Sequence, residues 1–329
     1  EAARDGRSRD ATEAMQGALR IVQAMDGMAR TVPLKTQRQH VTEWAADLVK
    51  ERELPRVDVG AVSAALGIVW PGTLALAYGE SQAGKSFWLQ FLERRYGARG
   101  FATLRLSCED ADRILRGRLV SECAGVDAMS DEGLTRDEQN RVQHAIANAD
   151  DSWDRRMVVE HPADAEGICQ TMRTAAVECD AKVVLIDYAQ LIRIASRGRN
   201  EETQERILAA STQLIKDTAK ECGQMVWLGS QVTIAKDQKR KFFKPTRHDT
   251  KGGKVLYDMA ELAVALWVNE TGQRFCEVQK NKINGKMPTA RIEVGPGGIF
   301  TKVLPWTPPA EPEQPSNPYG GNRYSKDFH

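Results

Sequence analysis

The chain has 329 residues, and its 46 lysine and arginine residues nearly balance its 45 aspartate and glutamate residues, giving a formal net charge of +1. This balance excludes a generally cationic nucleic-acid-binding protein, so any contact with nucleic acid has to come from a local basic patch. Six scattered cysteines without a C-x-x-C pair argue against a zinc site and a disulfide framework, and fit a reducing cytosol. No apolar run approaches the ~18 residues that span a membrane.

Residues 1–53 are polar and favour helix, and we expect an N-terminal helical or linker segment there. Within it, apolar side chains recur at helical spacing and form one stripe, at Val41, Trp44, Ala45, Leu48 and Val49. A short helix with one apolar stripe needs a surface to lie against, either its own domain or an adjacent subunit. Because the sequence opens without a methionine or a signal-peptide pattern, we expect it to be an excerpt of a longer protein.

Residues 54–304 alternate short apolar runs with amphipathic stretches, the pattern of a mostly parallel β-sheet flanked by helices. Several runs are apolar nearly throughout, as expected for strands buried on both faces. The expected strands are Thr73–Gly79, Phe101–Glu109, Met157–His161, Lys182–Tyr188, Met225–Gln231, Leu262–Val268, Phe275–Asn281 and Ala290–Val294. We therefore predict one α/β domain over residues 54–304 and a disordered, proline-rich tail at 305–329.

The segment YGESQAGKS contains the pattern G-x-x-x-x-G-K-S between an expected strand and an expected helix. Glycines let the backbone curl so that its N–H groups face phosphate groups at the positive end of a helix. Lys85 is expected to neutralise the β- and γ-phosphates, and Ser86 to ligate Mg²⁺. We predict an ATP site formed by Gly79, Glu80, Ser81, Gln82, Ala83, Gly84, Lys85, Ser86 and Phe87.

ATP hydrolysis also requires an acid for the metal shell and a base for the attacking water. Asp187 ends an apolar strand and is a candidate to hold Mg²⁺ directly or through water, with an ordinary strand-end acid as the alternative. Glu109 and Asp110 lie where a strand meets a helix, although an acid there also stabilises a helix N-terminus. Gln231 closes the next strand and is a candidate contact for the γ-phosphate, or a strand-end amide that satisfies the backbone.

A concentrated basic segment follows Gln231. Eight lysines and arginines stand there against two aspartates, at Lys236, Lys239, Arg240, Lys241, Lys244, Arg247, Lys251 and Lys254. Basic loops with aromatic residues, here Phe242 and Phe243, suit single-stranded nucleic acid without sequence preference. A shorter loop after Asp187 adds Arg197 and Arg199. The alternatives are a solvated charged surface for both loops and ordinary packing for the two phenylalanines.

The segment CEVQKNKINGK ends a strand with Lys280 and Lys282, separated by one asparagine. Side chains alternate along a strand, so both ammonium groups are expected on the same face, where they repel each other. Two such cations indicate a bound anion. The alternative is a solvated edge strand whose lysines discourage aggregation.

The order of these motifs, with LIDYAQL around Asp187 and GSQ at Gln231, resembles the RecA-like motor domain of DnaB-type replicative helicases. LSCEDADRILRGRLVSECAGV resembles that family's segment around its catalytic glutamate, which corresponds to Glu109. RHDTKGGKVLYDMAELAVAL resembles the segment before the following strand. The resemblance covers about residues 55–304, without the family's N-terminal collar or a primase module. It implies a RecA-like P-loop NTPase fold and a ring whose central channel is lined by the two basic loops.

One departure concerns the paired lysines. DnaB-type helicases carry an arginine finger in a K-x-R pattern, whereas this sequence has Lys280 and Lys282. VQKNKI is instead similar to the paired-lysine strand of RecA recombinases, whose lysines reach ATP bound by the neighbouring subunit. A lysine lacks the planar fork of arginine, so bidentate stabilisation is not expected here. The resemblance nevertheless implies that both lysines act on the γ-phosphate of a neighbour.

We therefore predict an ATP- and Mg²⁺-dependent, ring-forming DNA helicase or translocase, a hexamer acting on single-stranded DNA in replication. The expected partners are a second copy of the chain, single-stranded DNA, and a primase, loader or other replisome protein. The expected location is the cytoplasm, in bacterial or phage replication machinery. Two alternatives stay open: a RecA-type strand-exchange recombinase, and an ATP-gated DNA-binding adaptor or loader that unwinds nothing.

Overall fold

The computed structural model describes residues 36–39, 56–108, 112–160, 164–192, 204–232, 244–246, 249 and 255–307. The chain divides into two units, residues 1–54 and 55–329, which are described separately. In the first unit residues 37–39 are helical, and the side chains of Thr36 and Gln39 cap this turn reciprocally. The apolar stripe expected at Val41–Val49 lies outside the described residues.

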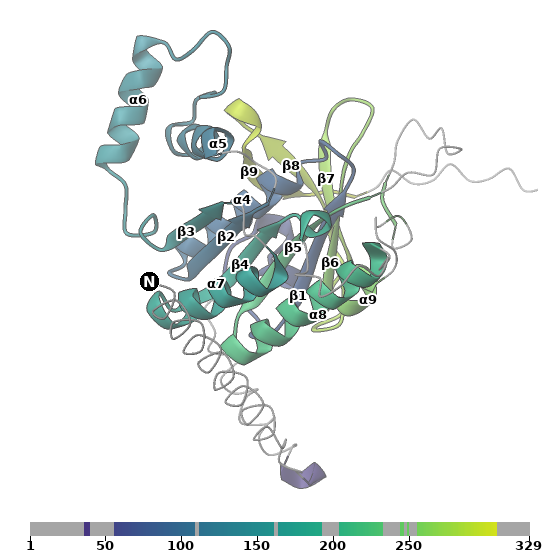
Figure 1. Ribbon diagram of the computed structural model, residues 1–329. Coiled ribbons are helices and arrows are strands. Elements are labelled where there is room, and N and C mark those ends of the chain that lie inside the picture. The colour runs from purple at the N-terminus through teal and green to yellow at the C-terminus, as the bar shows by residue number, and fades with distance from the viewer. Residues whose placement is uncertain are drawn as a thin grey trace, which may run out of the picture. The chain divides into compact units, whose positions relative to one another are not determined.

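In the second unit the described strands form one sheet, in the order β3-β2-β4-β5-β1-β6-β7-β8-β9 (Figure 1). The strands from β3 to β6 in this order are parallel, and β7, β8 and β9 continue the sheet in antiparallel pairing. The strands are β1 (Leu74–Gly79), β2 (Ala102–Ser107), β3 (Arg156–Glu160), β4 (Ala181–Asp187), β5 (Met225–Gln231), β6 (Leu262–Val268), β7 (Arg274–Asn281), β8 (Thr289–Val294) and β9 (Phe300–Pro305). The parallel part brings the carboxyl ends of β1, β4 and β5 to one edge, where sites form on such sheets.

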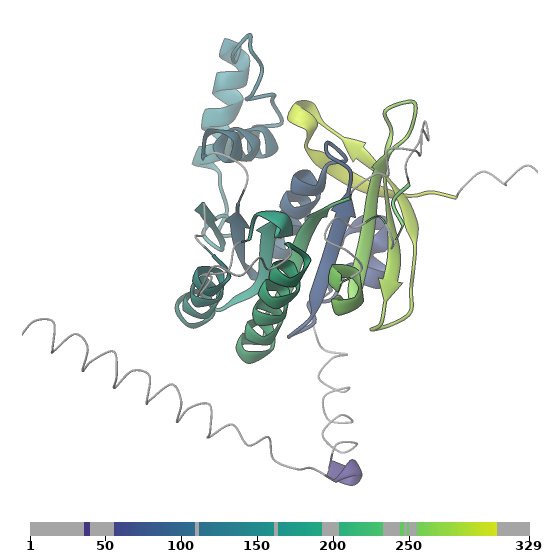
Figure 2. The same ribbon diagram turned by 45° about the vertical axis from the view of Figure 1, so that its right-hand side comes forward.

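Helices cover both faces of the sheet (Figure 2). The described helical segments are η1 (Gly60–Val62), α3 (Ser63–Leu66), α4 (Lys85–Ala98), α5 (Asp112–Ala124), α6 (Arg136–Ala147), α7 (Ala165–Glu178), η2 (Ala189–Leu191), α8 (Gln204–Cys222), α9 (Val255–Met259) and η3 (Pro296–Gly298). Helices α7, α8 and α9 pack on one face and α4 on the other. Helix α6 stands away from the sheet, and its start is set by a capping box between Thr135 and Glu138.

The core consists of two apolar layers, one on each face of the sheet. Leu74, Leu76 and Tyr78 of β1 belong to the layer under α7 and α8, and Ala75 and Ala77 belong to the layer under α4. Every residue of β1 is buried, which is why its sequence reads as a continuous apolar run. The loop that follows β1 therefore starts from the centre of a rigid sheet.

The expected strands correspond to β1 to β8, and the predicted α/β fold with a mostly parallel sheet is confirmed. Strand β9 was not expected. It forms the edge of the sheet, so burial alternates along it and its short sequence lacks a continuous apolar signal. Within the described ranges, no helix has both the length and the apolar character needed to cross a membrane.

Candidate nucleotide-binding site

The loop from Gly79 to Gly84 connects β1 to α4 at the carboxyl edge of the sheet. Gly84 is the N-cap of α4 with φ of +97°, a left-handed conformation that favours glycine. A Cβ atom on Gly79 would lie 2.5 Å from the Leu266 carbonyl oxygen, and one on Gly84 would lie 2.5 Å from Phe300 Cζ. Both glycines are therefore required by close packing. Because Gly84 has no side chain, it does not cap the first amides of α4, which suit an anion.

Lys85 holds the loop from inside. Its ammonium group donates hydrogen bonds to the carbonyl oxygens of Gly79 (3.1 Å) and Glu80 (2.6 Å). The positive charge thus lies beside the loop backbone at the helix N-terminus, where a phosphate group is favoured twice, by charge and by amide donors. Burial raises the pKa of the Glu80 carboxyl, and the charge of Lys85 acts in the opposite direction.

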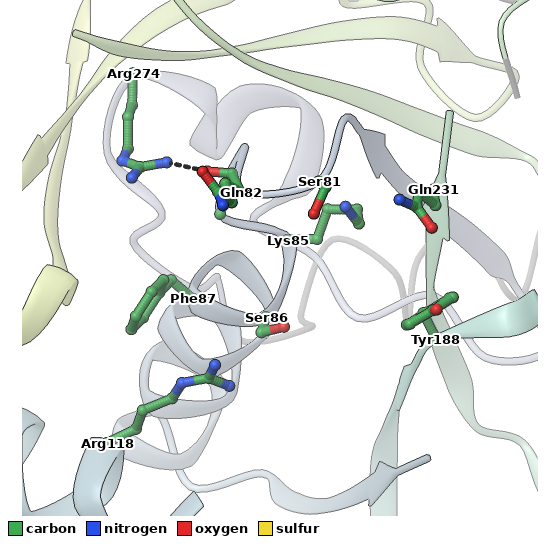
Figure 3. A pocket seen from close by; sticks show the side chains of 10 residues that line it. Ser81, Gln82, Lys85, Ser86, Phe87, Arg118, Tyr188, Gln231 and Arg274 are labelled. Carbon is green, nitrogen blue, oxygen red and sulfur yellow. Dashed lines mark hydrogen bonds between the residues drawn. The ribbon is translucent and has the colours of Figure 1, made fainter. Parts of the chain in front are cut away.

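A cleft of about 450 Å³ opens in front of this loop. Figure 3 shows Phe87, Arg118 and Arg274 on one side of the opening, and Gln231 and Tyr188 on the other. The remaining lining residues are Ser81, Gln82, Gly84, Lys85 and Ser86. The structure therefore brings most of the predicted ATP-site residues together with Gln231, which comes from β5. This arrangement has the size and the cations expected for a bound triphosphate.

Asp187 is placed at the carboxyl end of β4, two strands away from β1. It is 1% exposed, and among the described residues neither of its carboxylate oxygens has a hydrogen-bond partner. Buried carboxylates are normally hydrogen-bonded or bound to a metal, so these oxygens are available to Mg²⁺ or its water shell. With the Ser86 hydroxyl lining the adjacent cleft, the residues present fit a magnesium ion.

Gln190 was not predicted from the sequence, yet it positions Gln231. Its side-chain amide donates to Ser230 Oγ (2.9 Å) and to the Gln231 carbonyl oxygen (3.3 Å), and its Oε1 accepts from the Gln231 amide (3.2 Å). Gln190 lies in η2, directly after Asp187 and Tyr188. The ends of β4 and β5 are thereby tied together beside the cleft. The pattern LIDYAQL was noted for Asp187, and its glutamine was the available signal.

Two arginines of the cleft were also missed. Arg274 begins β7 and donates to the Gln82 carbonyl oxygen (2.7 Å), with its guanidinium 5.9 Å from the Phe300 ring. Arg118 of α5 lies 5.0 Å from the ring of Phe87. Both follow no local motif and reach the cleft only through the fold. Burial lowers the pKa of Arg274, which remains a cation at neutral pH.

Comparison with known proteins supports the same assignment. The sequence profile described as "DnaB-like helicase C terminal domain" matches residues 66–284, which is more than half of the chain. The chain belongs to this DnaB-like helicase family. A search of curated protein sequences found no significant match.

Solved structures show the fold of this helicase domain. One is described as "The Structure Of A DnaB-Like Replicative Helicase And Its Interactions With Primase", with 13% identity, a TM-score of 0.67, and coverage of 90% of this chain and 76% of that one. The isolated ATPase domain of a second helicase gives 14%, 0.68, 82% and 99% for the same quantities. A KaiC-like protein from Pyrococcus horikoshii OT3 gives 17%, 0.53, 77% and 100%.

Several predicted residues of the helicase domain lie outside the described residues. These are Glu109 and Asp110, the short-loop residues Arg197 and Arg199, and Lys236, Lys239, Arg240, Lys241, Arg247, Lys251 and Lys254 of the basic segment. Lys244 is described, and its ammonium group pairs with the Glu277 carboxylate of β7 (2.8 Å) and lies 5.6 Å from the Trp267 ring. This part of the basic segment is therefore attached to the sheet next to the strand that carries the lysine pair.

The lysine pair lies at the opposite edge of the sheet from the phosphate loop. Lys280 is opposite Ala263 at a register shift between β6 and β7, and Lys282 follows the end of β7. The Lys280 ammonium group donates to the carbonyl oxygens of Tyr257 and Asp258 (3.1 Å for Asp258) and lies over the Tyr257 ring. Burial and then the charge of Lys282 lower the pKa of Lys280 to about 8. Lys280 is thus packed on α9 within its own chain.

Proposed function

We propose that this DnaB-like domain is an ATP-dependent, ring-forming helicase or translocase that acts on single-stranded DNA during replication. The observation that carries the proposal is the phosphate loop, whose glycines, helix amides and Lys85 face one cleft with Gln231 and the two arginines. The family assignment supports the helicase class, and the site supports ATP as the fuel.

Each residue has a distinct task in this proposal. The α4 amides and Lys85 bind the phosphate groups, and Ser86 and Asp187 hold Mg²⁺, which when bound stabilises charge that develops on the phosphates. Glu109 orients and deprotonates the attacking water, by its resemblance to the family's catalytic glutamate. Arg118 and Arg274 add positive charge at the rim of the cleft. Gln231 contacts the γ-phosphate and passes its loss to the segment that follows β5.

The structure supports a site that is completed by a neighbouring subunit. The Lys282 amide donates to the Glu261 carbonyl oxygen, and the Glu261 amide donates to that of Leu74, so Lys282 is level with the first residue of β1. The phosphate loop begins at the last residue of the same strand. Lys282 therefore lies too far from the nucleotide of its own chain, and we assign Lys280 and Lys282 to the nucleotide of the next subunit. A closed ring of such head-to-tail contacts, a hexamer, follows from the family resemblance.

Single-stranded DNA is assigned to the basic segment between β5 and α9, with the arginines of the shorter loop as a second contact. A DnaB-like helicase has been described with primase, and we propose a primase, loader or other replisome protein as a partner here as well. The corresponding place of action is the cytoplasmic replication machinery of a bacterium or phage.

A strand-displacement assay on a forked duplex tests the proposal, with Lys85→Ala as the matched inactive variant. We expect ATP-dependent unwinding that this variant abolishes, and loss of turnover with retained nucleotide binding in Glu109→Gln. ATP turnover without unwinding would favour the adaptor or loader. Electron microscopy separates the recombinase, which the paired lysines favour, because it would form open filaments on DNA instead of closed rings.

A further inference from the structure

A chain of buried charges runs from Asp187 through the interior of the domain. It alternates guanidinium and carboxylate groups in the order Asp187, Arg105, Glu93, Arg156, Glu122 and Arg94. Arg105 lies on β2, Glu93 on α4 and Glu122 on α5, so five elements of the fold contribute to it. Three positive groups face three negative groups. The chain is therefore electrically balanced when every member is ionised.

Arg105 is the member that links this chain to the nucleotide site. Its guanidinium lies 3.7 Å from Asp187 Oδ2 and 3.7 Å from Glu93 Oε2, and all three side chains are at most 2% exposed. Neither contact is short enough for a hydrogen bond, so Arg105 acts on both carboxylates mainly through its charge. In this dry environment charge interactions are only weakly screened.

An unshared cation beside Asp187 would oppose a divalent ion there. Glu93 is fully buried, and no hydrogen bond to either of its carboxylate oxygens is found among the described residues. Its partners are Arg105 and Arg156. Burial raises the pKa of the Glu93 carboxyl, whereas Arg156 and Arg105 favour its ionised form. Removing this one negative charge would leave Arg105 with Asp187 as its remaining anionic partner in the chain of charges.

We propose that Glu93 is a positioning residue that offsets the charge of Arg105, so that Asp187 keeps its affinity for Mg²⁺. The inference rests on the proposed role of Asp187 as the magnesium carboxylate. It gives α4 two tasks, because the helix that presents Lys85 and Ser86 at its start also sets the charge beside Asp187 from within. Glu93 itself does not reach the cleft and does not contact the nucleotide.

The test measures Mg²⁺ affinity and not turnover. A fluorescent, non-hydrolysable ATP analogue is bound to the full-length chain, and Mg²⁺ is titrated at constant ionic strength; binding in EDTA is measured separately. Glu93→Gln should raise the half-saturating Mg²⁺ concentration about tenfold, the size of a typical coupling between sites. Its EDTA binding should stay within about twofold of the unchanged protein, because Glu93 does not face the phosphates.

Glu122→Gln is the matched control, because it removes the same charge from the same buried chain without contacting Arg105. It should change the Mg²⁺ midpoint by less than about twofold. Glu93→Gln combined with Arg105→Gln restores charge balance near Asp187, and its midpoint should return to within about threefold of the unchanged protein. If Glu93→Gln does not fold by circular dichroism, Arg105→Gln alone should lower the midpoint.

Three outcomes overturn the inference: an unchanged midpoint in Glu93→Gln, an equal shift in Glu122→Gln, or a double variant as weak as Glu93→Gln. Asp187→Ala separates this failure from failure of the proposed function. If Asp187→Ala leaves Mg²⁺ dependence unchanged, Asp187 does not hold the metal and both proposals fail. If it removes Mg²⁺ dependence while Glu93→Gln has no effect, only the role of Glu93 is wrong.

Discussion

Mixing two inactive variants tests whether the lysine pair acts on a neighbour's nucleotide. Lys282 is level with the start of β1 and the phosphate loop with its end, and the six residues of this strand span roughly 17 Å. A lysine side chain cannot bridge this distance together with the two strand spacings between β7 and β1. Lys282→Ala therefore damages the neighbour's site, and Lys85→Ala damages the subunit's own.

The expected recovery follows from counting sites. Each variant alone should lose at least about a hundredfold in basal ATPase rate, as expected when a cation on the transferred phosphoryl group is removed. In a random mixture a site works when its own subunit carries Lys282→Ala and the subunit lending the lysine carries Lys85→Ala. At equal amounts this holds for about a quarter of the sites in a head-to-tail ring.

The assay is the steady-state ATPase rate at several mixing ratios after subunit exchange. The rate should rise to a maximum near equal amounts and fall on either side. Lys286→Ala, which removes another exposed lysine from the same turn, should keep the full rate and serves as the control. A rate that stays at background at every ratio, while gel filtration shows mixed oligomers, would refute a shared site.

Three further predictions concern single residues. Gly79→Ala should abolish binding of a fluorescent ATP analogue, because its Cβ would lie 2.5 Å from the Leu266 carbonyl oxygen; normal affinity would mean that the loop relaxes freely. Arg274→Ala should weaken the same binding about tenfold by removing a cation at the rim, while Arg291→Ala on the neighbouring strand β8 should have no effect. Lys280, with a pKa of about 8, should be acetylated at a rate that rises with pH around a midpoint near 8, followed by peptide mass spectrometry; a midpoint above 10 would contradict its packing on α9.

The sequence alone determined those features that depend on neighbouring residues in the chain. The phosphate loop was located because a buried strand, glycines, a lysine and a helix follow each other within a short segment. The buried strands β1, β4 and β5 were recognised because both of their faces are covered, which makes their sequences continuously apolar. Asp187 was identified for the same reason, since it ends such a strand.

Only the tertiary structure decided which distant residues meet. Arg274 and Arg118 reach the cleft through the pairing of β7 and the position of α5, and nothing in their local sequence indicates it. Lys280 was expected to share a face with Lys282, but the register shift opposite Ala263 and the packing of α9 place its ammonium group against Tyr257. Burial of Arg105 between two carboxylates likewise depends on contacts among three separate elements. Such contacts are set by strand order and register, which a local pattern does not encode.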